Sequence, residues 1–119
     1  MNMNNRTMRA SFLFYLLYFV FSPVGAQRSD VLDAARCTND YFMQKYADPT
    51  LPTNVKKVRP SSLWTRAVYY EGLMALNAID PQQRYIDYAM KWADFHKWTP
   101  RNGVNTCDAD DQCCGQTYV

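Results

Sequence analysis

The sequence predicts an all-α fold made of antiparallel helical hairpins. Three segments repeat apolar residues at the spacing of a helix. Glycine is scarce, with four in 119 residues, and the alternation typical of strands is absent. The connections alternate between long and short, and a short connection makes its two helices antiparallel neighbours. We therefore expect pairs of helices in which one member is more buried than the other.

The first helix is expected over about 30–47, as the outer member of its pair. Asp30 can cap its start, and the Asp48-Pro49 step ends it. Its stripe at helical spacing consists of Val31, Ala34, Ala35, Thr38 and Phe42. A long Pro-bearing loop over 48–61 follows.

The second helix is expected over about 62–79, with Ser61 or Ser62 accepting the free N–H groups of its first turn. Its main stripe is Leu63, Ala67, Tyr70 and Met74, and it is widened by Trp64, Val68, Ala75 and Ala78. A helix that is apolar over so much of its circumference is typically buried on several sides.

The third helix starts after Asp80-Pro81, a cap followed by proline in the first turn, and runs to about Lys97. One face carries Tyr85, Ala89, Trp92 and His96, flanked by Ile86 and Ala93, and the other carries Arg84, Asp87, Lys91 and Asp94. This pattern predicts an amphipathic outer helix. A fourth helix begins near Gln112, capped by Asp110 or Asp111.

Both long loops, 48–61 and 98–111, fall at the end where the two buried helices begin. This arrangement is typical of a toroid in which a ring of buried helices is wrapped by exposed ones. Two hairpins cannot close a ring, so we expect an incomplete N-terminal part. Trp64, Tyr70 and Met74 would then face absent helices, which favours aggregation or oligomerisation.

The N-terminus, 1–26, is interpreted as a secretory signal peptide. Arg6 and Arg9 precede an unbroken apolar run over 12–21, and Val24-Gly25-Ala26 matches a small-residue cleavage site. Ten apolar residues are fewer than the roughly 20 that span a bilayer. The alternative is a retained membrane anchor. Cleavage leaves an incomplete helical domain over 27–119, secreted or periplasmic.

The charge and the cysteine spacing argue against several classes of partner and metal site. A net charge of +2 is too small to imply a nucleic-acid partner or an anionic membrane. The four cysteines do not have zinc-site spacing, and the sequence contains no metal cluster, phosphate loop or nucleophile elbow. We interpret the cysteines as mostly small buried residues, with a Cys37–Cys107 bridge left open.

Three carboxylates crowd the last loop, at Asp108, Asp110 and Asp111. Adjacent carboxylates repel one another, and a carboxyl that keeps its proton can serve as a general acid. The alternative is structural, with Asp110 and Asp111 capping the fourth helix and compensating its dipole.

Aromatic and cationic side chains near the same end are candidate saccharide ligands. Trp64 and Trp98 can stack on a sugar ring, whereas core packing is the better interpretation of Trp92, Tyr70 and Tyr85. Arg66 and Arg101 can hold a uronate carboxylate with two hydrogen bonds, or be solvated surface charges. His96, the only histidine, is expected to make an interhelical hydrogen bond.

Three segments in order carry a family resemblance. They are Leu63-Trp-Thr-Arg-Ala-Val-Tyr-Tyr-Glu-Gly-Leu-Met-Ala-Leu76, then Arg84-Tyr-Ile-Asp-Tyr-Ala89, then Ala109-Asp-Asp-Gln-Cys-Cys-Gly-Gln-Thr-Tyr118. Together they resemble the unsaturated glucuronyl and rhamnogalacturonyl hydrolases of glycoside hydrolase families 88 and 105. The resemblance covers about 61–119 and implies an (α/α)6 barrel, of which this chain would supply the N-terminal helical hairpins.

The resemblance implies an activity on oligosaccharides that end in a 4,5-unsaturated uronic acid. Such enzymes hydrate the C4=C5 vinyl ether. A carboxylic acid protonates C4, water adds at C5, the hemiketal opens and the aglycone leaves. No metal or organic cofactor is needed.

The resemblance also places site residues. Of the two aspartates that the family uses, one matches the Asp110-Asp111 pair, with Asp111 the better equivalent. The second, the general acid/base, lies beyond position 119, so we expect no hydrolase activity from these 119 residues. Loss of the vinyl absorbance of an unsaturated disaccharide would contradict this. Trp64 matches a position near the unsaturated sugar, and Arg66 matches it less closely.

Two other functional hypotheses stay open at this point. One is a non-catalytic helical toroid that binds a saccharide or a protein partner. The other is a different (α/α)6 enzyme, such as a sugar epimerase, which predicts histidine pairs further along the reading frame. An aspartate flanked by aromatics in that extension would favour the hydrolase.

Overall fold

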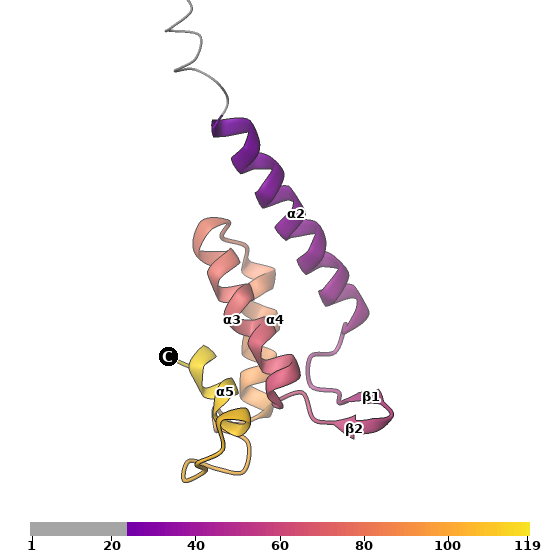
Figure 1. The fold of residues 1–119 in the computed structure, drawn as a ribbon, viewed down its shortest axis with the longest axis vertical. Coiled ribbons are helices and arrows are strands. Elements are labelled where there is room, and N and C mark those ends of the chain that lie inside the picture. The colour runs from indigo at the N-terminus through magenta and orange to yellow at the C-terminus, as the bar shows by residue number, and fades with distance from the viewer. Residues whose placement is uncertain (1–23) are drawn as a thin grey trace, which may run out of the picture. The chain divides into compact units, whose positions relative to one another are not determined.

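Four helices and one short hairpin form the part of the chain that the computed structural model describes, residues 24–119 (Figure 1). The elements are α2 (Val24–Lys45), β1 (Thr53–Val55), β2 (Lys57–Arg59), α3 (Trp64–Ile79), α4 (Gln83–Phe95) and α5 (Ala109–Thr117). The expected signal peptide, except its last three residues, lies outside the described part. The chain divides into two units, Met1–Cys37 and Thr38–Val119, and α2 contributes to both.

The antiparallel pair α3–α4 holds the aromatic core of the second unit. The ring of Tyr70 on α3 stacks on Trp92 of α4, with centroids 3.8 Å apart and planes inclined by 12°. Tyr70, Trp92 and Tyr85 are fully buried, so their interpretation as core residues is confirmed. The expectation that Tyr70 faces absent helices is wrong, because α4 covers it.

Helix α4 has the two faces that its sequence predicts. Tyr85, Ala89 and Trp92 are buried, whereas Arg84, Asp87, Lys91 and Asp94 are exposed. Of the main stripe expected in α3, Ala67 and Tyr70 are buried, whereas Leu63 and Met74 are half-buried. The expected burial of Trp64, Val68, Ala75 and Ala78 is wrong, since all four are exposed. Arg66, Leu73 and Leu76 complete the buried side of α3 instead.

The sequence-based caps of the first three helices are wrong. Helix α2 runs through Asp30 from Val24. Leu63 occupies the N-cap of α3, without a side-chain hydrogen bond, because Ser61 Oγ is engaged by the preceding loop and by His96.

A side chain near the end of α3 accepts a hydrogen bond from the backbone at the start of α4. Gln82 is its N-cap, and the Gln82 N–H donates to Asn77 Oδ1 at 3.0 Å. Asp80 is the C-cap of α3 and accepts from Gln82 Nε2 at 2.6 Å. The Asp80-Pro81 step therefore belongs to the turn between the helices rather than to the first turn of α4.

A two-stranded antiparallel hairpin lies within the segment expected to be an irregular loop. Thr53 lies opposite Arg59 and Val55 opposite Lys57, and Lys56 turns the chain with φ 62°. Each strand has only three residues. Such a strand is too short for alternation to be visible in a sequence.

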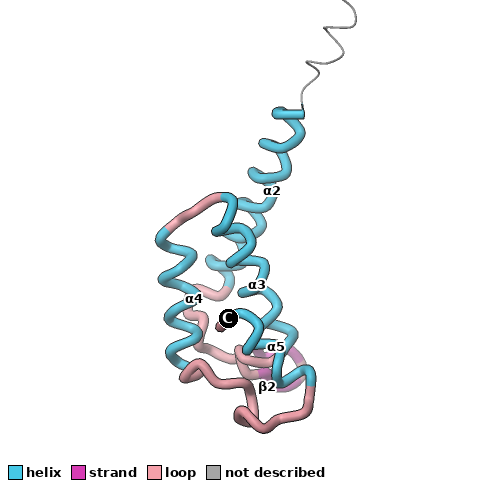
Figure 2. Tube along the Cα trace, turned by 90° about the vertical axis from the view of Figure 1, so that its left-hand side faces the viewer, coloured by secondary structure: helices cyan, strands magenta, loops and turns pink. Residues whose placement is uncertain are grey.

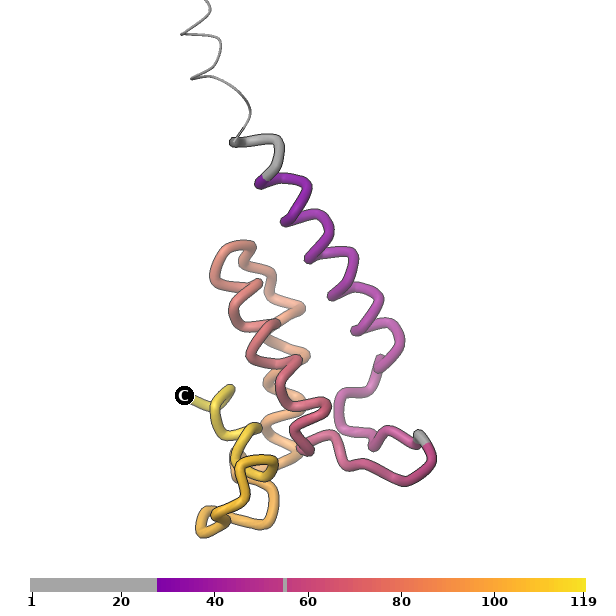
Figure 3. Tube along the Cα trace, viewed as in Figure 1, coloured from indigo at the N-terminus to yellow at the C-terminus, as the bar shows by residue number. Residues whose placement is uncertain are grey.

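The long connections lie at one end of the α3–α4 pair, opposite the tight α3–α4 turn (Figures 1 and 2). One is the segment with the hairpin, and the other is 96–108, between α4 and α5. Helix α5 packs against α3, and the colour gradient shows it beside the start of α3 (Figure 3). The expectation that both long loops fall at the end where α3 and α5 begin is confirmed.

The cysteines are free thiols. Only Cys114 is buried, Cys113 is half-buried, and Cys37 and Cys107 are exposed. The expectation of mostly buried cysteines is therefore wrong, and the open Cys37–Cys107 bridge is not formed. Among residues 24–119, no helix is long and apolar enough to cross a membrane. No group of three or more His, Cys, Asp or Glu side chains in that range is arranged to hold a metal ion.

Candidate functional site

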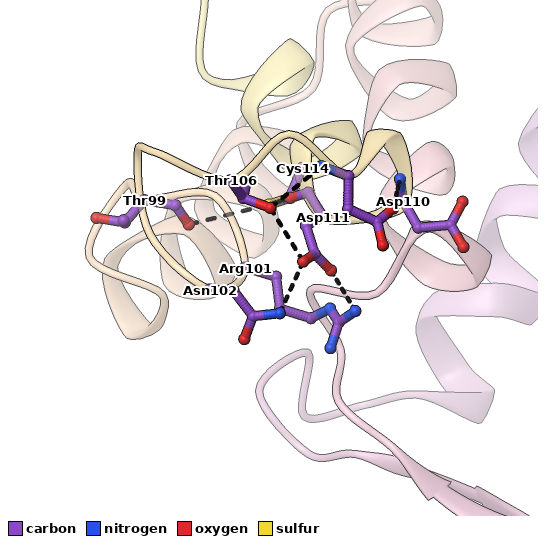
Figure 4. A network of polar contacts seen from close by, with 8 residues as sticks. Thr99, Arg101, Asn102, Thr106, Asp110, Asp111 and Cys114 are labelled. Atoms are coloured by element: carbon purple, nitrogen blue, oxygen red, sulfur yellow. Dashed lines mark hydrogen bonds and ion pairs between the residues drawn. The ribbon is translucent and has the colours of Figure 1, made fainter.

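Asp111 lies in the first turn of α5 and is the centre of a polar network (Figure 4). Its side chain forms an ion pair with Arg101. Its Oδ2 atom accepts from Asn102 Nδ2 at 2.7 Å and from Thr106 Oγ1 at 3.2 Å. The residue is 2% exposed. A buried carboxylate is tolerated only when it is paired and hydrogen-bonded in this way.

The loop before α5 is shaped to bring these donors together. Asn102 and Gly103 both have positive φ, 65° and 90°, a conformation that asparagine and glycine tolerate best. The Gly103 N–H donates to the Pro100 carbonyl at 2.9 Å, and the Arg101 N–H donates to the Asp111 carbonyl at 3.1 Å. The loop is thus tied to α5 through both the main chain and the side chain of Asp111.

The three crowded carboxylates have separate surroundings. Asp108 is the N-cap of α5, and its Oδ1 accepts from the Asp110 N–H at 2.9 Å. The sequence-based assignment of the cap to Asp110 or Asp111 is therefore wrong, although both lie in the first turn, where a negative charge favours the helix dipole. Asp110 is exposed, whereas Asp111 is turned inward (Figure 4).

The two candidate stacking residues keep large exposed faces. Trp98 is 45% exposed; its indole N–H donates to Asp94 Oδ1 at 2.8 Å, and its ring packs on Tyr118 with centroids 5.4 Å apart. Trp64 is 46% exposed and is the first residue of α3. Both side chains therefore have free aromatic surface, unlike the buried Trp92.

Arg66 lies inside the molecule, and its interpretation as a solvated surface charge is wrong. It is 5% exposed. Its Nη1 donates to the Leu51 carbonyl at 3.1 Å and to Thr53 Oγ1 at 3.0 Å. The guanidinium carbon lies 4.0 Å from the centroid of the Tyr46 ring, within the range of a cation–π contact. Arg66 thus fastens the start of the hairpin to α3.

Arg101 is also not a solvated charge. Its side chain is 31% exposed and is paired with Asp111. Its ion pair therefore belongs to the network, and any ligand would have to compete with Asp111 for this guanidinium.

His96 bonds to the segment before α3, so the expectation of an interhelical hydrogen bond is wrong in its partner. Its Nε2 lies 2.8 Å from Ser61 Oγ, and Ser61 is almost fully buried. The Ser61 carbonyl accepts from the Trp92 indole N–H at 3.1 Å. Burial lowers the pKa of His96 below its ordinary value of 6.5. The end of α4 is thereby joined to the segment before α3.

Two residues of the network, Asn102 and Thr106, were not identified by sequence reasoning. The Asn102-Gly103 dipeptide is a turn signal, and it could have indicated a tight loop next to the carboxylates. Nothing in the sequence indicates that the amide of Asn102 reaches Asp111, because that contact depends on the path of the loop.

The helical hairpins, with an acidic loop and two exposed tryptophans at one end, are consistent with a glycoside hydrolase scaffold. The profile of Glycosyl Hydrolase Family 88 matches residues 34–119, and the chain belongs to that family. The described elements are accordingly N-terminal helical hairpins of an (α/α)6 barrel. Neither the curated proteins nor the solved structures contain a significant match.

Proposed function

We propose that this chain belongs to an exported hydrolase that removes 4,5-unsaturated uronic acid from lyase-generated oligosaccharides, of the unsaturated rhamnogalacturonyl type. Family membership supports a glycosidase acting on a uronyl saccharide. The observation that carries the proposal is the buried Asp111, held by three donors beside the exposed Asp110. A secreted or periplasmic location is part of the proposal.

The proposed reaction is hydration of the C4=C5 vinyl ether. A proton is added at C4 and water at C5, after which the hemiketal opens and releases the aglycone. In this scheme Asp110 and Asp111 are the carboxylates on the substrate side. Asp111 is surrounded by N–H and O–H donors, so it is suited to stay an acceptor and keep the loop in place. Asp110 is free to face the sugar.

The sugar ring is proposed to stack on Trp64 or Trp98. Each indole has an exposed face, and tryptophan binds well where one side meets an apolar ring and the other meets water. Arg66 is proposed as the cation on the substrate side, because it is the candidate arginine not paired with a carboxylate among residues 24–119.

The proposal is tested by the preference of the chain for an unsaturated saccharide end. Binding of an unsaturated rhamnogalacturonan disaccharide and of its saturated counterpart is compared by saturation-transfer NMR titration. We expect the unsaturated disaccharide to bind about tenfold more tightly, a difference of ~1.4 kcal/mol. Asp110→Asn should reduce the preference, whereas Asp87→Asn, on the outer face of α4, should not. Equal affinity for both disaccharides would instead favour the non-catalytic saccharide-binding alternative.

A further inference from the structure

Two arginines flank Thr53 where the hairpin meets α3. Arg59 on β2 lies directly opposite Thr53 on β1, and opposite residues of an antiparallel pair project their side chains from the same face. Arg66 reaches Thr53 from α3, with its Nη1 atom 3.0 Å from Thr53 Oγ1. Figure 1 shows the hairpin beside the first turn of α3. Arg66 therefore reaches Thr53 by a hydrogen bond, and Arg59 is the cross-strand neighbour of the same threonine.

The positive charge of this pair is not balanced within the described part of the chain. The ion pairs there are formed by Arg36, Arg84, Lys91 and Arg101, with Asp33, Asp40, Asp48 and Asp111. None of them includes Arg59 or Arg66. Lys56 and Lys57, at the hairpin turn, are exposed and add positive charge to the same hairpin. A partly buried cation without an anion is unfavourable.

Three N–H groups of the pair are buried without an acceptor in hydrogen-bond geometry, although the Tyr88 hydroxyl lies close to the Arg66 side chain. They are Nε of Arg59 and both Nε and Nη2 of Arg66. Arg66 is 5% exposed, so water does not compensate for the missing bonds. Buried donors are nearly always hydrogen-bonded in native proteins, and an exception calls for a partner that the chain does not supply.

The geometry points to a binding site for a carboxylate-bearing saccharide, formed by Arg59 and Arg66 on either side of Thr53. The planar fork of a guanidinium matches the two oxygens of a carboxylate, and two such forks with unused donors match it better than a neutral hydroxyl. The assignment of the ligand class rests on the proposed function, which supplies acidic saccharides. The position of the site rests on the hairpin and on Arg66 in the first turn of α3.

Galacturonate tests this site, because it has the carboxylate but no C4=C5 bond. Its binding to the full chain is measured by saturation-transfer NMR titration, with galactose as the neutral analogue. We expect galacturonate to bind and galactose to bind at least about tenfold more weakly, as the loss of charge-assisted hydrogen bonds predicts. Equal binding of the two sugars, or no binding of galacturonate, would overturn the proposal.

A matched pair of variants locates the site. Arg59→Gln removes one fork, and Lys57→Gln makes the same charge change on the same face of β2. We expect Arg59→Gln to weaken galacturonate binding about tenfold and Lys57→Gln to leave it within about twofold. Similar losses in both variants would show diffuse attraction to a basic hairpin and would contradict a built site. Circular dichroism checks that each variant keeps its helix content.

Two further comparisons separate the possible causes of failure. Arg66→Lys keeps the charge but loses the fork, so weakened binding in this variant supports recognition of the two carboxylate oxygens, and unchanged binding contradicts it. Sulfate that displaces galacturonate at equal concentration would reassign the site to sulfate esters. The unsaturated-end preference does not enter any of these measurements, so the hydrolase proposal can fail while this site stands, and the reverse.

Discussion

Asp110 and Asp111 are identical neighbours with opposite surroundings. The side chain of Asp110 is exposed, whereas Asp111 is buried against Arg101 and Asn102. The difference arises because successive residues of a helix point about 100° apart, so that only one of two neighbours can face the preceding loop. One carboxylate therefore organises the loop and the other stays available to a ligand.

At this scale we predict that Asp111→Asn destabilises the chain by roughly 1–3 kcal/mol. The amide has nearly the shape of the carboxylate, but it cannot neutralise Arg101, whose side chain is 31% exposed. The free energy of unfolding is measured by urea denaturation. Asp110→Asn is the control and should stay within about 0.5 kcal/mol, as exposed substitutions usually do. Equal effects of the two substitutions would show that the network does not support the loop.

Element by element, the sequence predicts what depends on periodicity and misses what depends on the path of the chain. The faces of α4 are predicted correctly because its polar and apolar residues separate cleanly at helical spacing. The N-cap of α3 is not predicted correctly, because the Ser61 hydroxyl bonds to Thr50 and His96 instead of to the first turn of α3. Likewise, the burial of Arg66 depends on contacts with Leu51 and Thr53, which are formed only after the hairpin folds.

The stability contributed by the contact between the end of α4 and the segment before α3 should depend on pH, because His96 forms this contact. Burial lowers the folded-state pKa of His96 below 6.5, so near pH 6 the unfolded chain binds more protons than the folded one. The contribution of this residue is therefore fully present above the unfolded-state pKa and is lost as the pH falls through 6.5 toward the folded-state value.

We accordingly predict that protonation of His96 decreases the free energy of unfolding when the pH is lowered from about 7.5 to about 5.5. Carboxyl groups contribute little to this change, because they titrate mainly below this window. Urea denaturation at both values measures the decrease. His96→Gln, which cannot gain a proton, should be less sensitive to pH. His96 is the only histidine of the chain, so an unchanged pH dependence in the variant would rule out this origin.

For the whole molecule, the order and type of the helices and the end that carries the long loops follow from the sequence. The residue types of the candidate site do as well: carboxylates, tryptophans and arginines. The pairing of these residues cannot be predicted from the sequence. The folded loops alone bring together Arg101 with Asp111, and Arg59 with Thr53. The tertiary path also decides which side of α3 is covered. The second apolar face of α3 remains exposed and is available for contact with another chain.

An exposed apolar row on α3 should drive self-association of the 119-residue chain. Trp64, Val68 and Ile79 are 46%, 50% and 68% exposed, and their spacing of four and eleven residues places them on one helix face. Contiguous apolar surface of this kind typically marks a contact site.

We predict that the double variant Val68→Lys, Ile79→Lys has a lower sedimentation coefficient, closer to that of a monomer, because two like charges on the row oppose its pairing. Val104→Lys, at a loop position that is 77% exposed, is the control. If all these chains sediment alike, the row does not mediate association.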